Sequence, residues 1–211
     1  MLTWLAFTKL ADTVVMLPAA MLCLFWLAIA REWRLAGLWC LLLGAGLLLV
    51  TATKIAFIGW GIGIPELDFT GISGHAMRAA AIMPVTLYLL AQKARPWGCR
   101  IAVIAGMGFG LGVSVSRLML QVHSASEVMA GYILGAAISL TFIRMLVDAS
   151  RIRLPKPALA LGLLLLLPAS MAAPAPTEQW LQQVALSLSG HGRPFVRVEW
   201  KEGSVDHPSS G

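Results

Sequence analysis

Long apolar runs, separated by short basic stretches, most constrain how this chain can fold. Residues 41–50 contain only Leu, Gly, Ala and Val, and residues 163–167 are unbroken Leu. Charged residues make up 12% of the chain, about half of the roughly 25% that is usual in soluble domains. A helix satisfies its own backbone hydrogen bonds, so about 20 apolar residues can cross a bilayer as a helix. The sequence therefore predicts an all-α membrane protein.

The spacing of the runs predicts six transmembrane helices in one domain, residues 1–174. Repeated Gly and Pro65 end the second run and open a loop over residues 59–72. Small residues from Gly106 to Gly112 favour a central position for the fourth span, because they allow neighbouring backbones to approach closely. The predicted spans are residues 11–30, 35–58, 74–92, 101–119, 127–147 and 157–174.

A short polar C-terminal tail, residues 175–211, follows the predicted spans. Trp180, Leu181, Val184 and Leu188 recur at helical spacing, which indicates a short amphipathic helix on the membrane surface. Residues 194–200 alternate in the manner of a strand. The tail is therefore expected to hold one helix and one possible strand.

The positive charges predict the orientation of the chain. Basic residues gather in alternate loops, which places these loops on the cytoplasmic side. The net charge of +6 is explained by these loops, so it does not indicate nucleic-acid binding. The loop at 59–73, the break at 120–126 and the tail then share the opposite face. The cytoplasmic group comprises Arg31, Arg34, Lys93, Arg95, Arg100, Arg144, Arg151, Arg153 and Lys156.

Polar residues from three parts of the chain are expected to meet at that opposite face. Ionisable residues within membrane segments are by default candidates for a functional site. The group consists of Lys54, Ser73, Gly74, His75, Arg78, Arg117, His123 and Glu127.

These residue types suit phosphoryl chemistry. Cations and the free N–H groups of a helix start bind phosphate oxygens. Two histidines, His75 and His123, suit a nucleophile and a general acid. His123 and Glu127 lie four residues apart, so on a helix they would share a face. A carboxylate in that position would fix the tautomer of the imidazole.

The motifs resemble the type 2 phosphatidic acid phosphatase (PAP2) superfamily. Ser73-Gly74-His75, followed by Ser116-Arg117, five residues, His123, three residues and an acid, is similar to the second and third signatures of that family. The resemblance covers residues 50–135. It implies a PAP2-like bundle of six transmembrane helices.

The resemblance also implies a mechanism. His123 would attack phosphorus and form a phosphohistidine, His75 would protonate the leaving oxygen, and Glu127 would orient His123. The phosphate would be held by Lys54, Ser73, Gly74 and Arg117. No metal and no other cofactor is expected, because the cations replace the metal. With the compact loops, the resemblance implies a lipid phosphatase of a bacterial inner membrane, whose site faces the periplasm and whose contacts are a lipid phosphate and membrane lipids.

Three positions depart from the family pattern. The first family signature places Arg-Pro seven residues after its Lys, where this chain has Gly61-Ile62. Arg78, on the first turn after His75, is the candidate replacement for that cation. Ile72 stands where the family has Pro, and Glu127 stands where it has Asp.

Three alternative functions remain open. A lipid phosphotransferase would use the same site with a different acceptor. A transporter or assembly protein would place polar groups along a path across the bilayer. Gly71-Ile72-Ser73-Gly74 also has the form found in intramembrane serine proteases, although that reading leaves Arg117 and Glu127 without a role.

Overall fold

A computed structural model describes residues 2–92, 94–148 and 177–197. Seven α-helices and one short 3-10 turn occupy these residues, and no strand is found among them. The residues 194–197 of the expected strand do not form one, and residues 198–200 lie outside the described residues. The helices are α1 (Leu2–Lys9), α2 (Thr13–Ile29), α3 (Trp33–Trp60), α4 (Gly74–Ala91), α5 (Pro96–Met119), α6 (Ala125–Asp148) and α8 (Thr177–Ser189), with the 3-10 turn η1 (Pro65–Leu67) between α3 and α4.

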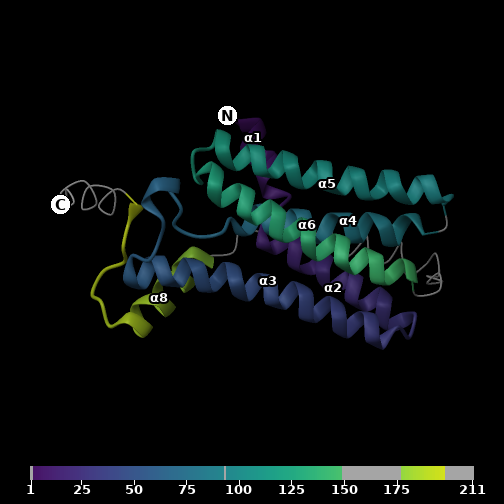
Figure 1. Cartoon of the computed structure of the whole chain (residues 1–211), viewed down its shortest axis with the longest axis horizontal. Helices are drawn as coiled ribbons and strands as arrows, with labels where there is room; N and C mark the ends of the chain where they lie inside the picture. The colour runs from purple at the N-terminus through teal and green to yellow at the C-terminus, as the bar shows by residue number, and fades with distance from the viewer. Residues whose placement is uncertain (1, 93, 149–176, 198–211) are drawn as a thin grey trace.

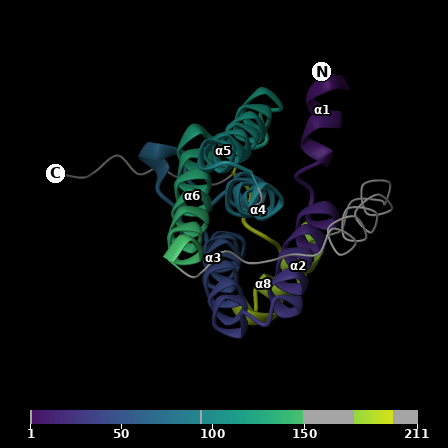
Figure 2. The same cartoon turned by 90° about the vertical axis from the view of Figure 1, so that its right-hand side faces the viewer.

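The central helix of the bundle is α4, not α5 as the glycines predicted. End-on, α4 lies among α2, α3, α5 and α6 (Figure 2). Its buried face is rich in alanine, and small residues of its neighbours pack against it. A Cβ on Gly110 of α5 would lie 2.9 Å from Cα of Ala80, and a Cβ on Gly131 of α6 would lie 2.5 Å from the carbonyl oxygen of Ser73. The glycines of α5 and α6 therefore let both helices approach α4 closely.

Three helices are long and apolar enough to cross a membrane: α3, α5 and residues Ala125–Val147 of α6. The helix α2 is apolar but has 17 residues. The helix α4 has 18 residues and carries His75 and Arg78 in its first turns. The predicted sixth span, residues 157–174, lies outside the described residues. The all-helical membrane class is thus supported, whereas six spans are not established.

The helix boundaries follow local signals. Asp12 caps α2, because its side chain accepts a hydrogen bond from the N–H of Val14. Gly61, with a φ of 68°, ends α3 in the left-handed conformation. The start of α5 was predicted too late, at residue 101. Pro96 occupies the first turn, where its fixed φ suits a helix start and its missing N–H is not needed.

The amphipathic helix expected in the tail is α8. It packs against the end of α3, where Ala185 is buried near Gly59. Trp180, Val184 and Leu188 remain exposed at helical spacing on the outer surface. An exposed apolar stripe of this kind suits a membrane interface, so contact of α8 with lipid stays a prediction.

Candidate phosphate site

Four helix ends meet at one end of the bundle and bring the predicted site residues together (Figure 1). The antiparallel course of α3, α4, α5 and α6 places two helix C-terminal ends beside two N-terminal ends. The residues are Lys54 on α3, Ser73, Gly74, His75 and Arg78 around the start of α4, Arg117 on α5, His123 in the turn before α6, and Glu127 in the first turn of α6.

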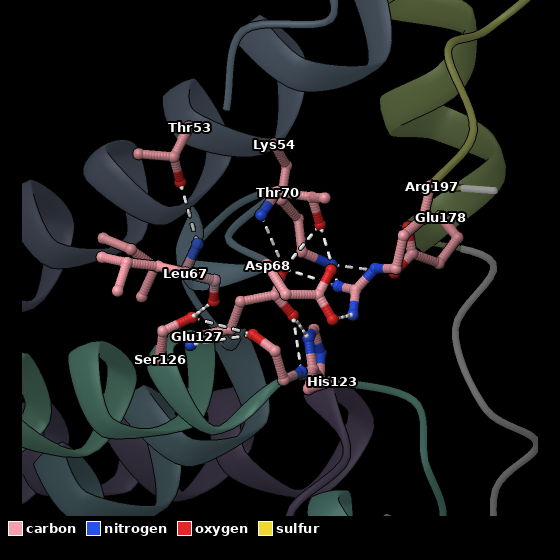
Figure 3. Close-up of polar contacts among 12 residues, drawn as sticks. Thr53, Lys54, Leu67, Asp68, Thr70, His123, Ser126, Glu127, Glu178 and Arg197 are labelled. Carbon is pink, nitrogen blue, oxygen red and sulfur yellow. Dashed lines mark hydrogen bonds and ion pairs between the residues drawn. The ribbon is translucent and has the colours of Figure 1, made fainter. Parts of the chain in front are cut away.

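His123 and Glu127 form a hydrogen-bonded pair. Nδ1 of His123 lies 2.7 Å from Oε2 of Glu127 (Figure 3). The contact was expected across a helix face, but His123 lies in the turn before α6. Because a carboxylate only accepts hydrogen bonds, Nδ1 of His123 carries the proton, and Nε2 then offers its lone pair. The pair therefore has the arrangement of an oriented nucleophile.

The Glu127 carboxylate is fully buried and has several donors. Oε1 accepts from the backbone N–H of Thr70 at 2.8 Å and from its hydroxyl at 2.5 Å. Oε2 also accepts from the N–H of Ser124 at 3.2 Å. A guanidinium nitrogen of Arg197, Nη2, lies 2.6 Å from Oε1. These donors compensate for the water that a buried carboxylate loses.

The loop before α4 is tied to both α3 and α6. The N–H of Ser73 donates to the carbonyl of Glu127 at 3.1 Å. The N–H of Ile72 donates to the hydroxyl of Thr53 at 3.2 Å. Gly71, with a φ of 149°, lies against Lys54, where a Cβ would be 3.2 Å from Cγ of the lysine. The loop therefore joins Ser73 to the start of α6 and places Gly71 against Lys54.

Several buried polar atoms at this end of the bundle have no protein partner. Among the described residues, these atoms include Oγ of Ser73, Nε of Arg78 and Nε of Arg117. The first N–H groups of α4 also lack acceptors within the helix. Gly74 leaves room for Arg78, since a Cβ there would lie 3.1 Å from Nη1 of the arginine. These donors are suited to an anion with several oxygens.

Lys54 is paired with a carboxylate from the tail. Its Nζ lies 2.8 Å from Oε1 of Glu178 on α8. The charges of Arg78 and Arg117 also interact with Glu178. Burial raises the pKa of Glu178, but the charge of Lys54 and its hydrogen bond outweigh this effect and lower the pKa. The carboxylate of Glu178 thus sits in a positive field that would also attract a phosphate.

His75 lies near an acid that the sequence reasoning did not single out. Its Nε2 is 3.9 Å from Oδ2 of Asp12. The contact with His75, together with the N–H of Val14 and the charge of Arg78, lowers the pKa of Asp12 to about 2 against the effect of burial. Asp12 is therefore ionised at neutral pH. Its charge favours a protonated His75, whereas burial of the imidazole disfavours that form.

The pKa of His123 is lowered from its ordinary value. Burial is the main cause, because it disfavours the charged imidazolium. Glu127 opposes this effect, whereas the charges of Lys54 and Arg117 add to it. At neutral pH the imidazole of His123 is therefore uncharged, as a nucleophile must be.

A pocket of about 180 Å³ opens beside this group of residues. Its walls include Lys54, His123, Glu178 and Arg197. A larger pocket of about 620 Å³ lies at the opposite end of the bundle, where Arg100 and Gln92 line it. None of the predicted catalytic side chains lines that larger pocket. We place the candidate site at the smaller pocket because Lys54 and His123 line it.

The described residues contain no cluster of three or more His, Cys, Asp or Glu side chains that could hold a metal ion. The predicted independence from metal stays a prediction.

Four residues at the site were missed by sequence reasoning: Asp12, Thr70, Glu178 and Arg197. Asp12 carried a usable signal, because an acid directly before an apolar run is typical of a helix N-cap. Thr70, Glu178 and Arg197 carried none, because their roles depend on contacts between distant parts of the chain.

The fold and site define a class: helical proteins with apolar helices of membrane-spanning length, in which a His–Glu pair lies beside buried cations. Comparison with known sequences agrees with this class. The sequence model of the PAP2 superfamily matches residues 60–151. The chain is also 36% identical over 203 residues to an "uncharacterized 22.5 kDa protein in cps region" of Klebsiella pneumoniae, covering 94% of this chain and 97% of that protein. This chain belongs to the PAP2 superfamily. No solved structure matches it significantly.

Proposed function

We propose that the protein is an integral-membrane phosphatase that hydrolyses a phosphomonoester or diphosphate on a lipid at the periplasmic face of a bacterial inner membrane. Membership of the PAP2 superfamily supports phosphatase chemistry in general. The observation that carries the proposal is the set of buried donors without protein partners on Ser73, Arg78 and Arg117, beside the His123–Glu127 pair. Buried polar groups are normally paired, so unpaired donors of this kind favour an anionic ligand.

The reaction proceeds in two steps. In the first, Nε2 of His123 attacks phosphorus, the bond from phosphorus to the lipid oxygen breaks, and His75 donates a proton to that oxygen. Glu127 accepts the Nδ1–H of His123 and stabilises the positive charge that develops on the ring. In the second, water attacks the phosphohistidine and gives a proton to His75, which releases inorganic phosphate and restores both histidines.

The cations stabilise the transferring group. Lys54, Arg78 and Arg117 face charge that grows on the phosphoryl oxygens, together with the hydroxyl of Ser73 and the N–H groups at the start of α4. The carboxylate of Glu178 forms an ion pair with the ammonium group of Lys54. The phosphate must displace this carboxylate to reach the ammonium group. The apolar helix surfaces next to the site suit the hydrocarbon part of a lipid substrate.

Two alternatives are less well supported. A transporter requires polar groups along the bundle, whereas the predicted site residues gather at one end. A serine protease requires a base that hydrogen-bonds the nucleophilic hydroxyl, but Oγ of Ser73 has no such partner among the described residues. A phosphotransferase would differ from the proposed phosphatase only in the acceptor of the second step.

The test is phosphate release by the purified protein from a panel of lipid phosphates. The panel contains a polyprenyl diphosphate, phosphatidic acid, phosphatidylglycerol phosphate and a lipid A phosphate. We expect release from at least one substrate, and its loss in His123→Ala and His75→Ala. His207→Ala, which removes a histidine from the tail, is the matched control and should retain activity. Movement of phosphate between lipids without release would favour the transferase, and undiminished release by both site variants would contradict the assignment.

A further inference from the structure

The end of the described tail, residues 190–197, is fixed to the outer end of α3. The N–H of Phe195 donates to the carbonyl of Ile58 at 3.0 Å, and Nδ1 of His191 lies 2.8 Å from the carbonyl of Gly59. The last carbonyls of a helix have no partner within it, so these contacts satisfy two of them. The ring of Phe195 lies over Gly61, where a Cβ would be 3.0 Å from it. These contacts set the position at which Arg197 enters the site.

Arg197 reaches the carboxylate that orients the proposed nucleophile. Its Nη2 is 2.6 Å from Oε1 of Glu127 and 3.0 Å from the hydroxyl of Thr70 (Figure 3). Its Nη1 is 3.4 Å from Oδ2 of Asp68. The guanidinium therefore joins the loop before α4 to the start of α6. Thr70 and Arg197 together hold Oε1, which leaves Oε2 directed at His123.

The charge of Arg197 also balances that of Glu127, the hydrogen-bond partner of His123. Glu127 is a fully buried anion, and an unpaired buried anion is strongly unfavourable. In the absence of Arg197, the nearest way to neutralise Glu127 would be to protonate His123, which would remove the nucleophile. The other charged groups that interact with His123 are Lys54 on α3, Arg117 on α5 and Glu178 on α8. Within the described residues, Glu127 forms ion pairs with His123 and Arg197 only.

We propose that Arg197 is a positioning residue of the phosphatase site, which fixes the carboxylate of Glu127 and keeps His123 uncharged. This inference rests on the proposed function, because it assigns Arg197 a role through the nucleophile. Arg197 lies 46 residues beyond the last residue matched by the PAP2 model, position 151. The tail thus adds a residue to the site that the family motifs do not contain.

The test compares Arg197→Met with Arg197→Lys. Both variants keep the length of the side-chain stem, but only lysine keeps the charge. The measurement is kcat/KM for the best lipid phosphate as a function of pH, with protein that is monodisperse in detergent. Arg193→Ala, which removes an exposed arginine from the same segment, is the control.

Removal of the charge takes away the cation that pairs with Glu127, and this favours the imidazolium form of His123. The acid limb of the Arg197→Met profile should therefore move to higher pH by about one unit. Its kcat/KM at the optimum should fall roughly 10–100-fold, because the nucleophile is less well oriented. Arg197→Lys should keep the wild-type acid limb and recover part of the rate. Arg193→Ala should match the wild type.

An unchanged acid limb in Arg197→Met overturns the proposal. So does a shift of equal size in Arg197→Lys, because a retained charge would then have no effect. If Arg197→Met does not fold, the proposal is tested by the pH profile of Arg197→Lys alone. A shift of its acid limb to higher pH then counts against the proposal. The variant His123→Ala separates a failure of the Arg197 proposal from a failure of the proposed function. Undiminished phosphate release in that variant overturns the proposed function itself.

Discussion

The ammonium group of Lys54 and the carboxylate of Glu178 lie 2.8 Å apart, although 124 residues separate them in the chain. Lys54 is largely buried, whereas 65% of the Glu178 side chain is exposed. An exposed partner of this kind adds little to stability. Its position matters more, because a carboxylate there stands where the proposed site would bind a phosphate oxygen.

Replacement of Glu178 by Gln should strengthen substrate binding. The change removes a negative charge that competes with phosphate for Lys54, so KM and the inhibition constant for vanadate should fall by roughly two- to fivefold. Steady-state kinetics on the purified protein measure both. Glu66→Gln, which neutralises an exposed carboxylate on η1, should leave both constants unchanged. An increase in KM for Glu178→Gln would show that Glu178 assists binding instead.

Arg78 is expected to supply the cation that the first family signature lacks. Arg78→Ala should weaken inhibition by vanadate about 10–100-fold, since hydrogen bonds to charged groups are the stronger ones. The comparison variant is Arg100→Ala, which removes an arginine at the opposite end of the bundle. Equal inhibition of the wild type and Arg78→Ala would exclude Arg78 from the phosphate site.

The proton donor can be tested through the leaving group. An alkoxide leaving group needs a proton, whereas a nitrophenolate does not. His75→Ala should therefore lose roughly 10²–10⁴-fold in kcat on a lipid alkyl phosphate and far less on nitrophenyl phosphate. His123→Ala should lose activity on both substrates. If both substrates respond equally to His75→Ala, His75 is not the general acid.

The pH profile of the wild type follows from the lowered pKa of His123. A lowered pKa in the folded protein keeps the imidazole uncharged to a lower pH than in a free histidine, whose pKa is about 6.5. The acid limb of kcat/KM should therefore lie below pH 6.5, with rate lost as pH falls through the pKa of the folded state. An acid limb at or above 6.5 would contradict a desolvated nucleophile.

Much of the bundle could be predicted because its signals are local. The apolar run of α6 was expected at residues 127–147 and is found at Ala125–Asp148. The start of α5 was missed by five residues, because the polar stretch around Arg95 and Arg100 suggested a loop and concealed the helix-starting role of Pro96. The sequence could not indicate which helix lies at the centre of the bundle, since small residues recur on more than one helix.

The candidate site could be predicted from the sequence where its residues belong to motifs. The sequence indicated His75, His123 and Glu127 through their spacing. The contacts of Glu178 and Arg197 depend on how the tail returns to α3, and a contact across 70 or more residues leaves no periodic signal. The sequence could therefore indicate the candidate catalytic side chains but not the tail residues that contact them.

Direct detection of a phosphorylated His123 tests the central claim most closely. The purified protein would be mixed with its best lipid phosphate, quenched rapidly under alkaline conditions that preserve phosphohistidine, digested and analysed by mass spectrometry. The proposed mechanism predicts one phosphoryl group on the peptide that contains His123, and its absence in His123→Ala. Turnover of the substrate by His123→Ala at the wild-type rate, with no phosphoryl group on His123 in the wild type, would contradict the mechanism.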